Sequence, residues 1–373
     1  MKKKTVKKTP TKPQSWSLYK GMQLYKRPRS PFFYGCLRIS NQYFKTGIQM
    51  AGVPLPSTNS ARPVGMLKNC PAHFQTPLMS VDKLAENLGI SSIHVKDERD
   101  RMKLGSFKAL GAAYVIASDA AEGDVSNTTY ITASAGNHGL SVAAGASAFG
   151  AKAVVYLSHT VPEDFATRLS KIGATVVRAG ENYEASMVAA QKTAADNDWV
   201  LLSDSSWDAY FDRPWRLMEG YTVMAAEIIQ QIEHVPTHIY LQAGVGGMAG
   251  AMAACFRNAW GDVPIITVVE PAFAPALTNS IIEGKFASTS GPVSDMGRLD
   301  CKEASLIALA GLSRDANSFV TLTERECLDA IKVLPKYNLD TSSSGGAGIA
   351  AMMMSDLPTD ARVLCILSEG PDE

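Results

Sequence analysis

A lysine at the start of an apolar helical segment is the first residue of this chain whose setting indicates chemistry. Lys108 is flanked by the apolar residues Phe107, Ala109 and Leu110. Burial among such neighbours lowers the pKa of a lysine and makes its neutral amine available to form a Schiff base. An isolated lysine is far more often a surface side chain with a buried stem, so other parts of the chain must support this interpretation.

A glycine cluster gives the first support, because it follows an apolar segment and precedes an Ala-rich one. It consists of Gly244, Val245, Gly246, Gly247 and Met248. Glycines allow backbone N–H groups to approach an anion closely, and the N-terminus of the next helix adds partial positive charge. The cluster has neither the Gly-Lys-Ser/Thr of a P-loop nor the GxGxxG pattern. It predicts a phosphate site that does not serve a nucleotide, with a tight turn as the alternative.

A third group of residues stands where an expected strand ends and an expected helix begins. It consists of Ser134, Ala135, Gly136, Asn137 and His138. Exposed N–H groups at such a helix start can bind a carboxylate, and Asn137 adds an amide donor. Helix capping is the alternative role for these polar residues. His138 is expected to pack or to form structural hydrogen bonds rather than to act as a base.

Short apolar segments alternate with helical segments along most of the chain, and together they must position these residues. The expected strands cover residues 93–96, 129–134, 153–157, 175–178, 200–203, 238–242, 265–269 and 363–367, and the expected helices cover 106–121, 136–149, 162–172, 183–196 and 248–260. Such alternation is typical of parallel α/β sheets covered by helices on both faces. Nearer the N-terminus, residues 34–39 and 42–44 predict a small hairpin.

Composition narrows the class of protein. With 373 residues, the chain is long enough for about two lobes, and an apolar fraction of 46% suits a globular enzyme. No segment approaches the roughly 18 apolar residues of a membrane span, and no apolar run follows the first lysines. Neither a membrane segment nor a secretory signal is therefore expected. Six cysteines without a CxxC pair predict reduced thiols, a cytoplasmic protein and no metal site.

Charge is distributed unevenly along the chain. Residues 1–81 contain 14 lysines and arginines and no acidic residue. This asymmetry predicts a basic, partly disordered extension and linker over residues 1–66. Bases alternate with aromatic residues between positions 19 and 38, which is typical of nucleic-acid contacts. A solvated extension is the simpler alternative.

Taken in order, the motifs resemble the fold-type II, tryptophan-synthase-β-like family of pyridoxal-phosphate (PLP) enzymes. The motifs are Ser-Phe-Lys at 106–108, Ser-Ala-Gly-Asn-His-Gly at 134–139, Ala-Gly-Val-Gly-Gly at 243–247 and Ser-Glu-Gly at 368–370. The resemblance implies PLP as the cofactor and a two-lobed α/β fold with parallel-rich sheets covered by helices. The large PLP-binding domain would comprise residues 67–108 and 205–373, and the small domain residues 109–204.

The same resemblance implies a role for each motif. Lys108 holds the cofactor, and Phe107 lies near its pyridine ring. Asn137 hydrogen-bonds the 3-oxygen of the cofactor, residues 244–248 bind its phosphate, and Ser368 lies by its pyridine nitrogen. The carboxylate of the substrate is expected on Ser134, Ala135, Gly136 and His138.

A more specific likeness, to the diaminopropionate ammonia-lyase family, covers roughly residues 76–370. It rests on Lys-Asp-Glu at 96–98, the segment 204–221, Leu-Gln-Ala-Gly-Val-Gly at 241–246, Val-Glu-Pro at 269–271 and Met-Gly-Arg-Leu-Asp-Cys-Lys-Glu at 296–303. The tryptophan-bearing segment 204–221 is the most distinguishing part, because ordinary serine and threonine dehydratases lack it. In that family, the residue matching Asp204 is an acid–base residue of the substrate pocket.

Three positions depart from the pattern of that family. Ala135 replaces an Asp, Ser343 replaces a Glu, and Glu219 replaces a Gln. The resemblance implies a homodimer that carries out α,β-elimination on a small L-amino acid of the diaminopropionate type, giving a 2-oxo acid and ammonia. Because of these departures, two other enzyme functions remain as alternatives. One is a serine/threonine-type or hydroxy-amino-acid dehydratase, and the other is a β-replacing synthase. The basic N-terminus leaves one further alternative, a nucleic-acid-binding protein whose enzyme fold has lost its activity.

Overall fold

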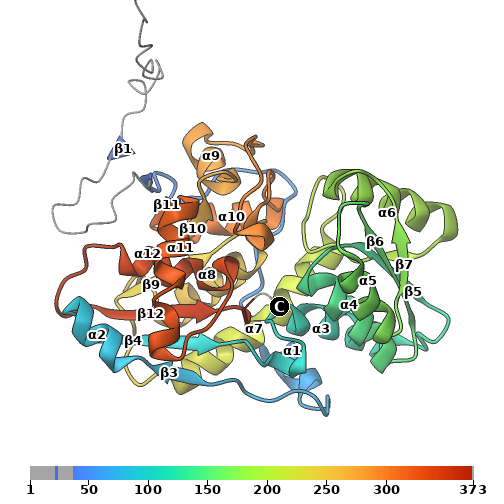
Figure 1. The fold of residues 1–373 in the computed structure, drawn as a ribbon, viewed down its shortest axis with the longest axis horizontal. Helices are drawn as coiled ribbons and strands as arrows, with labels where there is room; N and C mark the ends of the chain where they lie inside the picture. Colours follow the sequence, from blue (N-terminus) through green and yellow to red (C-terminus); the bar gives the residue numbers. More distant parts are fainter. Residues whose placement is uncertain (1–21, 24–36, 372–373) are drawn as a thin grey trace, which may run out of the picture.

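Two sheets organise the computed structural model, which describes residues 22–23 and 37–371 (Figure 1). The larger sheet has eight strands in the order β1-β2-β11-β10-β9-β12-β4-β3. These are β1 (Met22–Gln23), β2 (Arg38–Ser40), β3 (Leu78–Ser80), β4 (Ser92–Asp97), β9 (His238–Gln242), β10 (Ile265–Pro271), β11 (Ser318–Leu322) and β12 (Arg362–Leu367). The five strands from β11 to β4 pair in parallel, and antiparallel strands flank them on both sides.

The smaller sheet has four parallel strands in the order β7-β6-β5-β8. Its strands are β5 (Thr129–Ala133), β6 (Lys152–Leu157), β7 (Thr175–Arg178) and β8 (Val200–Leu201), and its helices include α4 (Asn137–Ala148), α5 (Glu163–Lys171) and α6 (Tyr183–Asn197). All five residues of β5 are buried, as expected for a parallel strand with both faces covered. Figure 1 shows this sheet and its helices as a lobe beside the larger sheet.

The remaining helices accompany the larger sheet or join the two lobes. They are α1 (Ala61–Leu67), α2 (Asp82–Leu88), α3 (Lys108–Glu122), α7 (Asp212–Gln231), α8 (Gly247–Trp260), α9 (Ala276–Glu283), α10 (Leu306–Asp315), α11 (Glu324–Ile331) and α12 (Ser343–Met353), with the short 3₁₀ turns η1 (Arg101–Lys103), η2 (Gly297–Leu299) and η3 (Leu334–Tyr337). Helix α7 packs against both α3 and α8. It therefore connects the lysine-bearing helix to the helix that follows the glycine cluster.

The expected α/β class with parallel-rich sheets is confirmed, but the expected N-terminal hairpin is wrong. Residues 42–44 lie in a turn, and β2 pairs with β11 and β1 instead. Asn41 is buried, and its amide donates to the carbonyl oxygens of Ser313 and Ala316, both at 2.7 Å. The exposed edge of β11 needs a partner strand, and β2 fills that place. Part of the segment expected as extension and linker thus belongs to the larger sheet, whereas residues 1–21 and 24–36 lie outside the described residues.

A buried ionic cluster fixes the segment that leads to Lys108. Glu227 on α7 accepts from Lys96 on β4 and from Arg101 in η1, both at 2.6 Å, and Arg101 also contacts Glu98 at 2.7 Å. The side chains of Lys96, Arg101 and Glu98 are fully buried. Buried charges require such pairing, because removal of one partner leaves the other charges unpaired and away from water. The cluster therefore fastens β4 and η1 to α7.

Other features of the described region bear on the class of protein. No helix within residues 22–23 and 37–371 has the length and apolar character needed to cross a membrane. Five cysteines in this region, Cys70, Cys255, Cys301, Cys327 and Cys365, are free thiols. The same region contains no group of three or more His, Cys, Asp or Glu side chains arranged to hold a metal ion.

Candidate active site

Lys108 and Asp204 form a contact that joins the two lobes. Lys108 is the first residue of α3, and Asp204 follows the end of β8. The Lys108 ammonium donates a hydrogen bond to Oδ2 of Asp204, and the two side chains are 23% and 17% exposed. The contact is thus largely, but not fully, shielded from water. The structure brings together the two residues that were expected to be catalytic.

The ionic contact decides the charge of both groups. Burial disfavours the ammonium of Lys108, but the carboxylate of Asp204 outweighs this effect, so the pKa of Lys108 is raised. Burial likewise disfavours the carboxylate of Asp204, but the Lys108 cation holds the pKa of Asp204 well below its usual range. The expected lowering of the lysine pKa by burial is therefore wrong for this state, because a counter-ion compensates for the lost hydration.

The glycine cluster forms a tight turn from β9 into α8. Gly246 has φ +95°, which favours glycine, and no side chain of the described residues caps the first turn of α8. A Cβ atom on Gly244 would lie 2.9 Å from Sγ of Cys301 and 3.1 Å from the carbonyl oxygen of Arg298. Only glycine fits at position 244, and the uncapped N–H groups at the start of α8 suit a phosphate.

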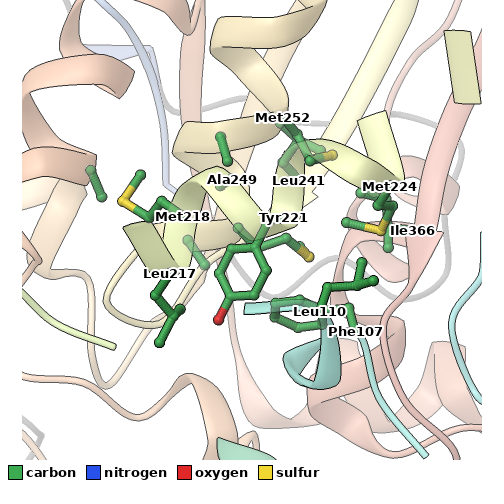
Figure 2. Packing of buried hydrophobic residues seen from close by; sticks show 14 of the residues in the cluster. Phe107, Leu110, Leu217, Met218, Tyr221, Met224, Leu241, Ala249, Met252 and Ile366 are labelled. Atoms are coloured by element: carbon green, nitrogen blue, oxygen red, sulfur yellow. The ribbon is translucent and has the colours of Figure 1, made fainter. Parts of the chain in front are cut away.

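The end of β12 lies beside the residue that precedes Lys108. The backbone N–H of Phe107 donates to the carbonyl oxygen of Ser368 at 3.3 Å, and Ser106 forms an isolated bridge with Glu369. Ser368 is 5% exposed. Figure 2 shows Phe107 among the apolar side chains of α7 and α8, so the chain just before Lys108 rests on a packed core. These contacts place the C-terminal motif next to the lysine motif.

Glu369 connects three further segments around this position. One carboxylate oxygen accepts from Nδ2 of Asn137 at 2.6 Å, and the other lies 3.0 Å from Nη1 of Arg298. The Ser342 hydroxyl also donates to Glu369. A carboxamide has two N–H hydrogens, and Asn137 donates one of its two to Glu369. Asn137 therefore reaches the site with its orientation already determined by a buried carboxylate.

The start of α4 carries the residues expected to bind a carboxylate. Gly136 is the N-cap of α4, and within the part of the chain that the structure describes no side chain caps the first turn. The Ser134 hydroxyl accepts from the N–H of Gly136 at 3.3 Å, and Ala135 is exposed. These N–H groups suit an anionic ligand, because the helix end carries partial positive charge.

His138 lies deeper and is held in one tautomer. Its Nε2 lies 2.8 Å from the carbonyl oxygen of Leu202. A carbonyl oxygen only accepts, so Nε2 carries the proton and Nδ1 is an acceptor. Nδ1 is buried and has no hydrogen-bond partner among the described residues. Burial lowers the pKa of His138, and Asp204 only partly opposes this effect. The imidazole is therefore neutral.

Two side chains at this site were not anticipated from the sequence. Glu369 follows Ser368 at the carboxyl end of a parallel strand, where ligands of open α/β sheets usually bind. That position could have identified Glu369 as a residue of the site. Tyr221 lies on α7 and packs edge-to-face on Phe107, with ring centroids 5.0 Å apart (Figure 2). Tyr221 is the last residue of the distinguishing segment 204–221, but the sequence assigns it no role, because α7 reaches the site only through tertiary packing.

The arrangement fits PLP. A Cβ atom on Gly247, the first residue of α8, would lie 3.8 Å from the carbonyl oxygen of Asp204, the partner of Lys108, so the lysine contact and this helix start are close together. Two buried polar atoms have no partner among the described residues, Tyr221 Oη and His138 Nδ1. Fold and site together define a PLP-dependent enzyme. The sequence model of the family described as "Pyridoxal-phosphate dependent enzyme" matches residues 70–369, and the chain belongs to this family.

Similar proteins include enzymes with named activities. The diaminopropionate ammonia-lyase of Salmonella typhimurium is 30% identical over 352 residues, covering 81% of this chain and 87% of that protein. The L-threonine ammonia-lyase of Geobacter sulfurreducens is 29% identical over 303 residues, with 79% and 71% covered. A crystal structure of Escherichia coli diaminopropionate ammonia-lyase in complex with an aminoacrylate-PLP azomethine reaction intermediate has a TM-score of 0.83 and 26% identity, with 91% and 95% covered.

Proposed function

We propose that this PLP-dependent enzyme removes a β-leaving group from a small L-amino acid of the diaminopropionate type, giving a 2-oxo acid and ammonia. The observation that carries this proposal is the contact of Lys108 with Asp204, which brings a lysine side chain and an ionised carboxylate together. The similarity to diaminopropionate ammonia-lyases over four-fifths of the chain supports the substrate class. For diaminopropionate, loss of the α-proton and the β-amino group leaves an imine, which water converts to pyruvate and a second ammonia.

Each group of the chain has a distinct task in this proposal. PLP, when bound, supplies the electron sink that makes the α-proton of an amino acid acidic. Lys108 holds the cofactor and, once released, its amine removes the α-proton. The Lys108 cation holds the pKa of Asp204 low, so Asp204 is ionised and orients the Lys108 side chain. With Lys108 joined to the cofactor that cation would be absent, the pKa of Asp204 would no longer be held down, and Asp204 could accept a proton. The N–H groups at residues 134–138 bind the carboxylate of the substrate.

The cofactor contacts are proposed from the same geometry. Residues 244–248 bind the phosphate at the start of α8, and Phe107 lies near the pyridine ring. Asn137 donates to the 3-oxygen of the cofactor with the amide hydrogen that Glu369 does not use. Ser368, at the end of β12, lies by the pyridine nitrogen. These residues would hold the cofactor near the ends of β9 and β12 and the start of α3.

A dehydratase acting on serine, threonine or another hydroxy-amino acid is the second candidate. Two observations favour it: Ala135 and Ser343 stand where the diaminopropionate family has carboxylates, and an L-threonine ammonia-lyase is 29% identical to this chain. The hydroxyl of such substrates must be protonated before it leaves. Asp204 is ionised in the structure, so this chemistry would need a proton from another donor.

A substrate panel separates the two candidates. Purified protein is supplied with PLP, and 2-oxo acid formation is followed with L- and D-diaminopropionate, L-serine and L-threonine. We expect the highest kcat/KM for L-diaminopropionate. Reaction with L-serine or L-threonine but with neither diaminopropionate isomer would favour the dehydratase. Borohydride reduction and peptide mapping test the lysine: label is expected on Lys108 and lost in Lys108→Ala. Lys103→Ala is the control, because Lys103 is an exposed lysine five residues earlier.

The organisation of the molecule is proposed in the same terms. The large PLP-binding domain comprises residues 67–108 and 205–373, the small domain comprises residues 109–204, and residues 1–66 precede them. The enzyme is a cytoplasmic homodimer in this proposal. The free cysteines of the described region support a reducing compartment. Sedimentation of the holoenzyme tests the dimer, and a monomer at micromolar concentration would contradict it.

A further inference from the structure

The phenol of Tyr221 is a buried polar group without a structural purpose. The residue is 1% exposed, and its Oη atom has no hydrogen-bond partner among the residues that the structure describes. A buried hydroxyl without a partner costs free energy, so native structures rarely keep one. By contrast, the Tyr114 hydroxyl, equally buried on α3, donates to Glu219 at 2.5 Å. The Tyr221 hydroxyl is therefore placed for something other than packing.

Two glycines show where the hydroxyl end of the ring lies. A Cβ atom on Gly111 would be 2.7 Å from Cε1 of Tyr221, and one on Gly247 would be 3.8 Å from Cε2. The two Cε atoms flank the carbon that bears the hydroxyl. That end of the ring is thus enclosed between α3, one turn after Lys108, and the first residue of α8.

The charges around the hydroxyl identify the kind of ligand that suits it. Burial raises the pKa of Tyr221, and the opposing effect of the Lys108 cation is smaller, so the phenol stays protonated and can donate. The start of α8 beside it is uncapped and carries partial positive charge. An acceptor that satisfies both the phenol and the helix start is an anion. The phosphate of PLP is the anion that this family brings to such a site.

We propose that Tyr221 is a cofactor-positioning residue whose hydroxyl donates a hydrogen bond to the phosphate of PLP. The inference rests on the proposed phosphate site at residues 244–248. It assigns to α7 a direct part in holding the cofactor, in addition to its packing between α3 and α8. The edge-to-face contact with Phe107 keeps the ring in place while the site is filled or emptied.

The test compares Tyr221→Phe with Tyr114→Phe, because each variant removes one hydroxyl and keeps the ring. We expect Tyr221→Phe to weaken PLP binding about tenfold or more, as loss of a hydrogen bond to a charged group does. Its apo protein should melt at the same temperature or higher, since an unsatisfied hydroxyl is removed. Tyr114→Phe should do the reverse, lowering the apo Tm while leaving the Kd of PLP within twofold.

Two cofactor analogues locate the hydrogen bond. 4-Deoxypyridoxine 5′-phosphate has the phosphate but no aldehyde, and Tyr221→Phe should weaken it as much as PLP. Pyridoxal lacks the phosphate, and its affinity should not change. An equal loss for pyridoxal would assign the hydroxyl to Lys108 and overturn the proposal, as would an unchanged Kd for PLP or a lowered apo Tm. Failure of the unmutated enzyme to bind PLP would instead contradict the phosphate site itself.

Discussion

Replacement of Asp204 by Asn removes one negative charge from the Lys108 contact and changes the side-chain volume little. Two consequences follow from the geometry. In turnover, the site loses a positioned proton acceptor, which typically costs about 10²- to 10⁴-fold in rate. In the apo protein, an ion pair with side chains 23% and 17% exposed is broken. Exposed pairs contribute about 0–1 kcal/mol, and removing one partner of a buried pair costs about 3–5 kcal/mol. We therefore expect a stability loss of about 1–3 kcal/mol.

The pH dependence of this loss has a definite sign. The folded pKa of Asp204 is lowered, so its contribution is present above the unfolded aspartate pKa, about 4, and is lost as pH falls further. The folded pKa of Lys108 is raised, so its contribution is present below the unfolded lysine pKa, about 10.4, and is lost as pH rises through the folded value. The stability difference between the apo wild type and Asp204→Asn should be largest between about pH 5 and 10.

The assay combines kcat/KM for L-diaminopropionate with urea denaturation of the apo protein at pH 3, 7 and 9. Asp119→Asn is the matched control. Asp119 lies on α3 about 16 Å along the helix from Lys108, and it pairs with Arg213 at 2.6 Å with a side chain 13% exposed. The control should lose stability but keep kcat/KM within about threefold. An Asp204→Asn enzyme with more than a tenth of the wild-type rate would refute the assignment of Asp204 as a proton acceptor.

Three further results are expected. D-Diaminopropionate should react at least about a hundredfold more slowly than the L-isomer, because Ala135 offers no base on the second face, and Ala135→Asp should narrow the gap; similar L and D rates in the wild type would contradict this. Glu227→Ala should cost about 3–5 kcal/mol in urea denaturation, whereas Glu122→Ala, in an exposed pair, should cost less than about 1 kcal/mol. Deletion of residues 1–36 should leave kcat/KM within about threefold, whereas deletion of 1–46 should lower the Tm because it removes β2; equal Tm values would refute the latter.

The parts of the molecule that could be predicted are those with short-range signals. The strands of parallel sheets are buried on both faces, so β12 appears in the sequence as a continuous apolar run over residues 363–367. The glycine cluster is visible because close backbone approach requires glycine, and Gly244 and Gly246 meet that requirement. The fold class and the cofactor followed from these local features together with their order along the chain.

The sequence pattern does not predict helix α7, although this helix is 20 residues long. It contains Pro214 and Gly220, which usually mark the end of a helix. Pro214 is tolerated because it lies in the first turn, where the missing N–H has no intrahelical partner. Gly220 is there for packing, since a Cβ atom would lie 2.8 Å from the carbonyl oxygen of Leu110 on α3. Both reasons depend on the neighbouring helix and not on the local sequence.

The error in the charge of Lys108 has the same origin. Its apolar neighbours correctly predict burial, and burial alone would lower its pKa. The counter-ion Asp204 is 96 residues away in the chain, and only the folded structure brings it into contact. The contact between Asn137 and Glu369 spans 232 residues, so it is equally invisible to a reading of neighbouring residues.

The site depends on the relation between the two lobes because each lobe supplies only part of it. The ends of β5 and β8 in the smaller sheet lead to residues 134–138 and to Asp204, whereas the ends of β9 and β12 in the larger sheet lead to the glycine cluster and to Ser368. Lys108 stands between them on α3. Since α7 packs on both α3 and α8, we expect a change in α7 to shift Lys108 relative to the proposed phosphate site at residues 244–248. Substitutions along α7 should therefore change cofactor affinity and kcat together, whereas substitutions confined to α5, on the smaller sheet, should change neither.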